Sequence, residues 1–67
     1  MQVRLNGRPQ DLPDGAPLTA AMRVLGVEDP RGVAVAVDGE VVPRGSWETT
    51  RLSAGQAVEV LRAVQGG

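Results

Sequence analysis

The chain is 67 residues long, carries a formal net charge of −1 and contains neither cysteine nor histidine. It fits one small domain without disulfides, and it lacks the thiolate and imidazole ligands of a zinc site and the histidine of a Ser-His-Asp arrangement, which argues against catalysis by this chain alone. The intermixed charges and the absence of a long apolar run predict a cytoplasmic protein that binds neither nucleic acid nor membrane.

The first twelve residues predict a β-hairpin. Residues 1–6 alternate between apolar and polar side chains, as in a strand with one buried face. Asn6-Gly7 is a strong turn signal because both turn positions need positive φ. We expect residues 8–12 to return as an edge strand, because Pro9 cannot donate a hydrogen bond to a neighbouring strand.

The apolar period then changes to that of a helix. Leu18, Ala21, Met22 and Leu25 form one helical stripe, so the spacing predicts a short helix over 18–25. Pro17 suits the first helical position, and Gly26 suits the left-handed residue that closes a helix. A helix this short depends on packing against a sheet.

Three further strands are expected. Residues 33–37 alternate valine and alanine, and we expect the valines to face the helix and Ala34 and Ala36 to face the other way. Asp38-Gly39 predicts a second hairpin to a strand over 40–42. An irregular link with Trp47, expected to fill the core or its edge, leads to a last strand over 57–64 with Leu61 and Ala63 on its outer face.

These elements predict an α+β fold of the β-grasp kind: a mixed five-stranded sheet packed on one short helix, with the last strand central and parallel to the first. We assign residues 1–64 to this single domain. Residues 65–67 are expected to form a flexible tail, because glycine fits where only a bare backbone passes and chain ends are usually mobile. Coincidence would also explain the final Gly66-Gly67, since 9 of the 67 residues are glycine.

The whole chain resembles the ThiS family, the ubiquitin-like sulfur carriers of thiamine biosynthesis. The resemblance depends on the order and spacing of several segments: the strand over 1–6, the helix over 18–25, the valine strand before Asp38, Val42-Pro43-Arg44 followed by Trp47, Gly55, and the terminal Val64-Gln65-Gly66-Gly67. Two features depart from the family pattern. Pro17 stands where relatives often have a hydroxyl cap, and no Phe or Tyr lies on the outer face of the last strand.

The resemblance implies a reaction cycle on the tail. An adenylyltransferase related to ubiquitin-activating enzymes would use ATP to adenylate the carboxylate of Gly67, and persulfide sulfur, derived from cysteine by a desulfurase, would then replace AMP. The resulting thiocarboxylate would deliver sulfur to thiazole synthase. The carrier itself is expected to be a monomer when free and to hold no cofactor or metal.

The expected partner contacts lie near the tail. Small and apolar residues on the open sheet face would form a docking patch, because exposed apolar patches often mark interfaces. The expected contacts are Ala34, Ala36, Leu61, Ala63, Val64 and Gln65, with Arg44 pairing with an acidic partner surface. Small residues that merely accompany a pleated strand, and a solvated Arg44, are the alternatives.

Three other functions remain open. A molybdopterin synthase small subunit shares the tail, although its members are longer and richer in aromatic residues. A protein modifier would attach Gly67 to lysines of other proteins; all seven basic residues here are arginine, which excludes lysine-linked chains of the protein itself. A plain interaction module would have an inert tail.

Overall fold

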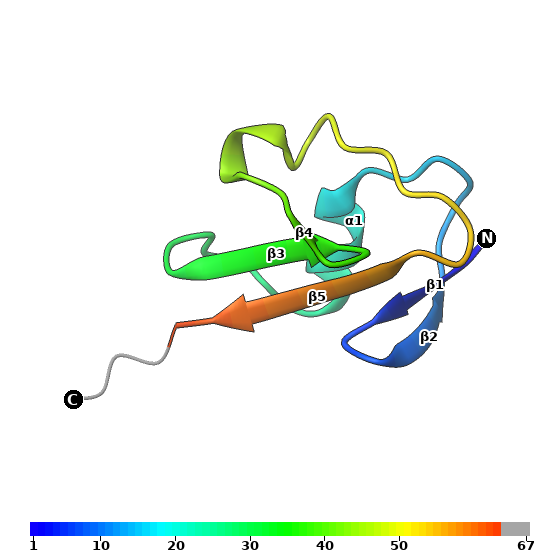
Figure 1. The fold of residues 1–67 in the computed structure, drawn as a ribbon, viewed down its shortest axis with the longest axis horizontal. Coiled ribbons are helices and arrows are strands. Elements are labelled where there is room, and N and C mark those ends of the chain that lie inside the picture. The colour runs from blue at the N-terminus through cyan, green and yellow to red at the C-terminus, as the bar shows by residue number, and fades with distance from the viewer. Residues whose placement is uncertain (64–67) are drawn as a thin grey trace.

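The computed structural model describes residues 1–63, which form a five-stranded mixed sheet with one short helix (Figure 1). The elements are β1 Gln2–Leu5, β2 Arg8–Asp11, α1 Leu18–Val24, β3 Val33–Val37, β4 Glu40–Val41, a 3₁₀ turn η1 Arg44–Ser46, and β5 Ala57–Arg62. The strand order is β2-β1-β5-β3-β4, in which only β1 and β5 are parallel. This confirms the predicted β-grasp fold with the last strand at its centre.

Both predicted hairpin turns are present. Asn6 and Asp38 each have a φ of 50°, and the glycines that follow them have φ of 84° and 82°. These left-handed conformations explain why glycine occupies the second position of each turn. β2, which contains Pro9, is an edge strand as expected.

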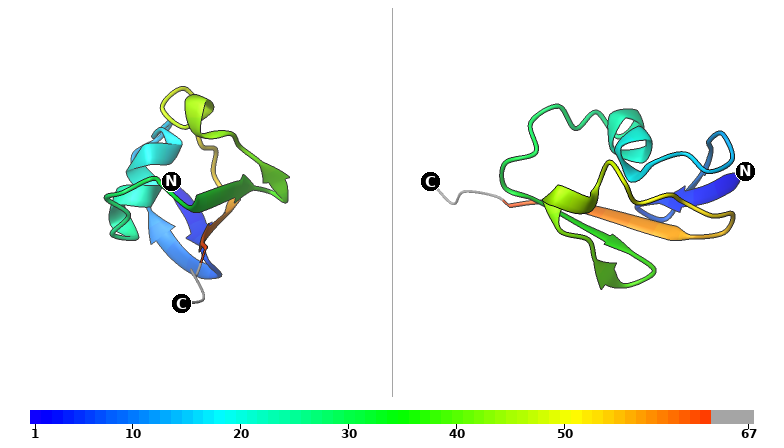
Figure 2. Two further views of the ribbon diagram at one scale, coloured as in Figure 1. Left: turned by 90° about the vertical axis from the view of Figure 1, so that its left-hand side faces the viewer. Right: turned by 90° about the horizontal axis from the view of Figure 1, so that it is seen from above.

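The core lies between α1 and one face of the sheet (Figure 2). Val3, Leu18, Val35 and Val58 are the largest side chains that are almost completely buried. Val35 and Val37 face this core, whereas Ala34 is exposed and Ala36 half-buried on the opposite face, as the alternation in β3 predicts.

α1 begins at Leu18 and is closed by Gly26, as predicted, but Pro17 has a different role from the one expected. Gly26, with a φ of 77°, donates its N–H to the carbonyl of Arg23, and Val27 donates to the carbonyl of Met22, which together form a Schellman motif. Pro17 precedes the helix as its N-cap and is not the first helical residue, because its ψ of 158° is extended. An isolated β-bridge to Arg51 holds Pro17 in that conformation.

The link between β4 and β5 covers the side of the core near α1. It contains η1 and Trp47, a residue that is buried and donates its indole N–H to the carbonyl of Val42 at 2.8 Å. This agrees with the expected role of Trp47 in the core. No helix among residues 1–63 is long and apolar enough to cross a membrane.

Candidate functional site

The last described residues are the end of the central strand β5 and Ala63. β5 ends at Arg62, and the exposed Ala63 donates its backbone N–H to the carbonyl of Gly32 at 2.7 Å, so β5 stays attached to the segment before β3 up to that residue. The four predicted site residues that follow are Val64, Gln65, Gly66 and Gly67. They lie outside the described residues, so their roles, and the predicted flexibility of the tail, stay predictions.

An apolar patch occupies one half of the uncovered sheet face. The strand register places Leu61 opposite Ala34, and Ala36 opposite Val41, so all four side chains share this face. Leu61 is 66% exposed and Val41 is 74% exposed. Exposed large apolar side chains that lie together are typical of interaction surfaces. We call Ala34, Ala36, Val41 and Leu61 the apolar patch.

The other half of the same face is polar. β1 and β2 place Gln2, Arg4, Pro9 and Asp11 on it, and all four are exposed. Glu59 stands between the two halves, on β5 opposite Ala36. The apolar patch is therefore confined to β3, β4 and the C-terminal half of β5.

Asn6 joins the first hairpin turn to the second half of β5. Its Oδ1 accepts the backbone N–H of Val60 at 2.8 Å, and its Nδ2 donates to the carbonyl of Val60 at 3.4 Å. The pairing of β1 with β5 ends before this point, at Leu5 and Val58. The side-chain amide thus occupies the place of one more residue of β1.

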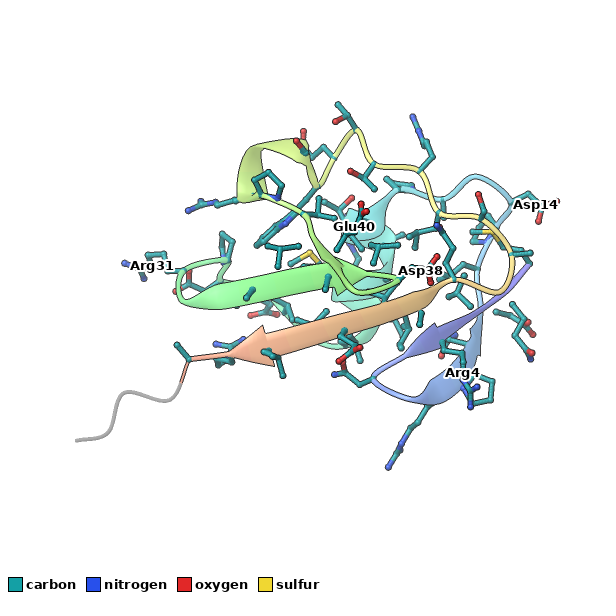
Figure 3. The ribbon with its side chains drawn as sticks, in the orientation of Figure 1. Arg4, Asp14, Arg31, Asp38 and Glu40 are labelled. Carbon is teal, nitrogen blue, oxygen red and sulfur yellow. The ribbon has the colours of Figure 1, made fainter. Side chains whose placement is uncertain are left out.

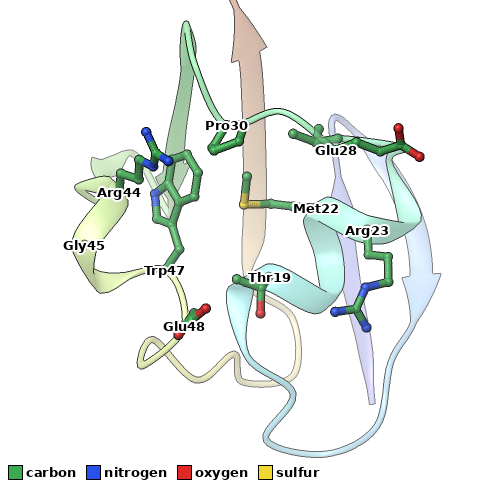
Figure 4. Close-up of a pocket in the computed structure, with 10 residues that line it drawn as sticks. Thr19, Met22, Arg23, Glu28, Pro30, Arg44, Gly45, Trp47 and Glu48 are labelled. Carbon is green, nitrogen blue, oxygen red and sulfur yellow. The ribbon is translucent and has the colours of Figure 1, made fainter.

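A pocket lies on the opposite side of the sheet, between α1, the loop after it and η1 (Figure 4). Met22, Val27 and Trp47 contribute apolar surface, and Arg44 lines its η1 side. Arg44 is exposed. Because this pocket is on the helix side of the sheet, Arg44 lies apart from the apolar patch.

The loop before β3 carries an ion pair at this end of the molecule. The guanidinium of Arg31 donates to the carboxylate of Asp29 at 2.8 Å, and the backbone N–H of Arg31 also donates to that carboxylate at 3.0 Å. These hydrogen bonds lower the pKa of Asp29, and the charges of Arg62 and Arg44 lower it further. Figure 3 shows Arg31 near the end of β5, whereas Asp38 and Glu40 lie toward the other end of the sheet.

The structure thus places Ala34, Ala36 and Leu61 together on one face of the sheet, with Ala63 directly after the end of β5. It does not place Arg44 beside them. Sequence reasoning missed Val41 and Asn6. Val41 was accessible to it, because a two-residue turn at Asp38-Gly39 places Val41 directly opposite Ala36. The contact of Asn6 joins residues that are 54 positions apart, and no local pattern signals it.

Comparison with known proteins agrees with this geometry. A sequence model described as the ThiS family matches residues 3–67. A crystal structure of the thiamine biosynthesis protein ThiS from Geobacter metallireducens is 30% identical, with a TM-score of 0.80 and full coverage of both chains. An NMR solution structure of a thiamine biosynthesis protein from the same organism is 32% identical, with a TM-score of 0.78, and is matched over 100% of this chain and 88% of that one. None of the curated protein sequences compared with the chain matches it significantly. The family match covers nearly all of the chain, which therefore belongs to the ThiS family of small sulfur-carrier proteins.

Proposed function

We propose that this protein carries sulfur, as a thiocarboxylate on Gly67, to the formation of the thiazole of thiamine. The observation that carries the proposal is the end of β5: the central strand terminates beside an exposed apolar patch, and the sequence continues from there to Gly66-Gly67. Membership of the ThiS family and the two thiamine biosynthesis structures support the pathway.

The terminal carboxylate needs activation before sulfur can be attached to it. The pKa of a free α-carboxyl group is about 3.5, so at neutral pH the group is an anion and a poor electrophile. Attack of a Gly67 carboxylate oxygen on the α-phosphate of ATP releases pyrophosphate and leaves an acyl adenylate, in which AMP is a good leaving group. An adenylyltransferase supplies the groups that catalyse this step, and ATP belongs to that enzyme's site.

Sulfur then replaces AMP. The terminal sulfur of a persulfide, formed from cysteine by a desulfurase, attacks the carbonyl carbon of Gly67 and expels AMP, which gives an acyl disulfide. A second thiol cleaves the S–S bond, is oxidised to a disulfide, and leaves the thiocarboxylate on Gly67. Because Gly66 and Gly67 have no side chains, they leave room for the attacking sulfur and for the walls of a narrow active-site channel.

The apolar patch is the proposed docking surface for the adenylyltransferase and then for thiazole synthase. Its position at the end of β5 would let one contact orient the tail toward the active site, which replaces a random encounter with a positioned one. We also propose that the protein acts in the cytoplasm and is a monomer between these encounters.

The central experiment is intact-mass spectrometry of the carrier after incubation with ATP, the adenylyltransferase and a persulfide donor. We expect the mass gain of one sulfur that replaces one oxygen, at the C-terminus, and its loss after transfer to thiazole synthase. A branched conjugate on another protein would instead support a protein modifier, and an unchanged mass would support an inert module. Transfer to a molybdopterin precursor and not to thiazole synthase would support the molybdopterin pathway.

A matched pair of variants tests the docking surface. Leu61→Asp places a charge in the apolar patch, whereas Gln2→Asp places the same group on the polar half of the same sheet face. We expect Leu61→Asp to weaken binding to the adenylyltransferase about tenfold or more, as for a central interface residue, and Gln2→Asp to change it little. Equal effects of the two variants would contradict this assignment of the docking surface.

A further inference from the structure

The two edges of β5 are paired to different extents. Along a strand the backbone groups of alternate residues point to opposite neighbours. The carbonyl of Ala57 accepts from Asp38 at 2.8 Å, and Ala63 donates to Gly32 at 2.7 Å, so these residues face β3 and the segment before it. The carbonyls of Gln56 and Val58 accept from β1, each at 2.9 Å, so these residues face the opposite edge.

The same alternation points the backbone groups of Val60 and Arg62 toward the β1 edge. β1 has already turned away there: β5 extends past the hairpin of β1 and β2 (Figure 1). The side-chain amide of Asn6 forms hydrogen bonds with both the N–H and the C=O of Val60. Beyond it, neither the N–H nor the C=O of Arg62 has a partner among residues 1–63. We call these two groups the open edge of β5.

An enzyme that reacts with Gly67 must approach this open edge. Gly67 is the fourth residue after Ala63, and four fully extended residues span at most about 14 Å. Part of the enzyme surface therefore lies within about 14 Å of Ala63 when Gly67 reacts. Where that surface covers Arg62, it displaces water from the open edge. A buried backbone N–H or C=O without a partner is unfavourable, so the wall that covers the open edge must offer both an acceptor and a donor.

We propose that the adenylyltransferase supplies an extended backbone segment that pairs with β5 at Arg62, in the position that β1 leaves after Asn6. Extended backbone offers donor and acceptor at the spacing that a strand edge requires, and adding a strand to an exposed edge is a common mode of peptide recognition. The inference rests on the proposed function, because it assumes that Gly67 enters an enzyme. Asn6 acts here as a positioning residue, since it ends the internal pairing and keeps β5 extended up to the open edge.

Amide hydrogen exchange of the unmodified protein, measured by NMR with and without saturating adenylyltransferase, tests the pairing directly. In the free protein the Arg62 amide should exchange fast, and the Ala63 amide, which is bonded to Gly32, more slowly. In the complex we expect exchange at Arg62 to slow to at least the level of Ala63. An Arg62 amide that still exchanges fast in the saturated complex overturns the proposal.

A pair of variants provides an independent test. Arg62→Pro removes the N–H of the open edge, and a strand edge tolerates proline where the lost N–H points outward. Arg62→Ala removes the same side chain but keeps the N–H. We expect Arg62→Pro to bind the adenylyltransferase roughly fivefold to tenfold more weakly than Arg62→Ala, the ratio expected for one hydrogen bond.

The thermal midpoints of the two variants and their Ala63 exchange rates show whether the fold is retained. Equal affinities for the adenylyltransferase would overturn the pairing while leaving the sulfur-carrier proposal intact. Failure of the natural protein to gain sulfur from ATP, the adenylyltransferase and a persulfide donor would instead contradict the proposed function itself. The two failures are therefore distinguishable.

Discussion

The two hairpin turns have nearly the same backbone but hold β5 in different ways. In the first turn, Asn6 uses both atoms of its amide on Val60. In the second, the carboxylate of Asp38 accepts the N–H of Ala57 at 2.9 Å, and the backbone N–H of Asp38 donates to the carbonyl of Ala57. At the second turn the side chain needs to supply only an acceptor, because the backbone N–H of Asp38 already donates to Ala57. An amide is needed where the neighbouring strand has ended and both groups of β5 are open.

Removing the side chain of Asn6 is the largest expected effect. We expect Asn6→Ala to lower the free energy of unfolding by about 2–3 kcal/mol, because alanine is strained at positive φ and two hydrogen bonds to Val60 are lost. Asp38→Ala should cost less, because the carbonyl of Ala57 keeps its bond to the backbone N–H of Asp38, whereas both backbone groups of Val60 lose their partner in Asn6→Ala. Chemical denaturation measures both values. A larger loss for Asp38→Ala would contradict the difference between the turns.

Asn6→Gly and Asp38→Gly separate strain from hydrogen bonding. Glycine relieves the strain at positive φ and adds the same backbone freedom in both turns, so the difference between the two variants reports the side-chain contacts alone. We also expect the Val60 amide to exchange faster with solvent in Asn6→Gly. An unchanged exchange rate at Val60 would mean that the Asn6 contact does not protect β5.

The second residue of each turn should respond identically. Gly7 and Gly39 have φ of 84° and 82°, and a Cβ added at either would meet nothing within 4 Å. The cost of Gly7→Ala and of Gly39→Ala is therefore backbone strain alone, about 1–2 kcal/mol in each case. Thermal unfolding checks the two values. A clear difference between them would show that the turns differ in backbone and not only in side-chain chemistry.

Exchanging the two side chains tests their chemistry with little change of shape. Asn6→Asp keeps the acceptor for the N–H of Val60 but places a carboxylate oxygen against the carbonyl of Val60, and we expect a loss of about 1 kcal/mol at neutral pH. The loss should shrink at acidic pH, where a protonated carboxyl can donate. Asp38→Asn keeps the acceptor for Ala57 and should cost less. Unfolding free energies measured across pH decide whether this ranking holds.

The turns also show how far sequence alone leads. Asn6-Gly7 and Asp38-Gly39 predict both hairpins because glycine and asparagine tolerate positive φ, and the alternation in 33–37 predicts which side of β3 is buried. The choice of Asn at one turn and Asp at the other follows from the groups that β5 leaves open. Those groups are known only once β5 lies between β1 and β3. The position of Arg44 away from the apolar patch likewise depends on the path of η1, whose short segment has no periodic signal.

Asp29 provides the smallest expected effect and a useful contrast with both turns. Its carboxylate also accepts a backbone N–H, that of Arg31, but the contact stays within one exposed loop and does not touch β5. The hydrogen bonds from Arg31 hold the pKa of Asp29 below its ordinary value of 3.8. Since the pKa is depressed in the folded state, the contribution is present above pH 3.8 and is lost as the pH falls through the folded-state value.

We therefore expect the thermal midpoint of the natural protein to fall slightly more below pH 4 than that of Asp29→Asn, with the difference reduced by salt because the pair is exposed to solvent. Above this range the natural protein should keep a slightly higher midpoint than Asp29→Asn, and the two midpoints should converge as the pH falls. A large loss of stability in Asp29→Asn at neutral pH would mean that this loop supports the end of β5 as strongly as the hairpin turns do. The contact of Asp29 with the backbone of Arg31 would then matter as much for stability as the contacts of Asn6 and Asp38 with β5.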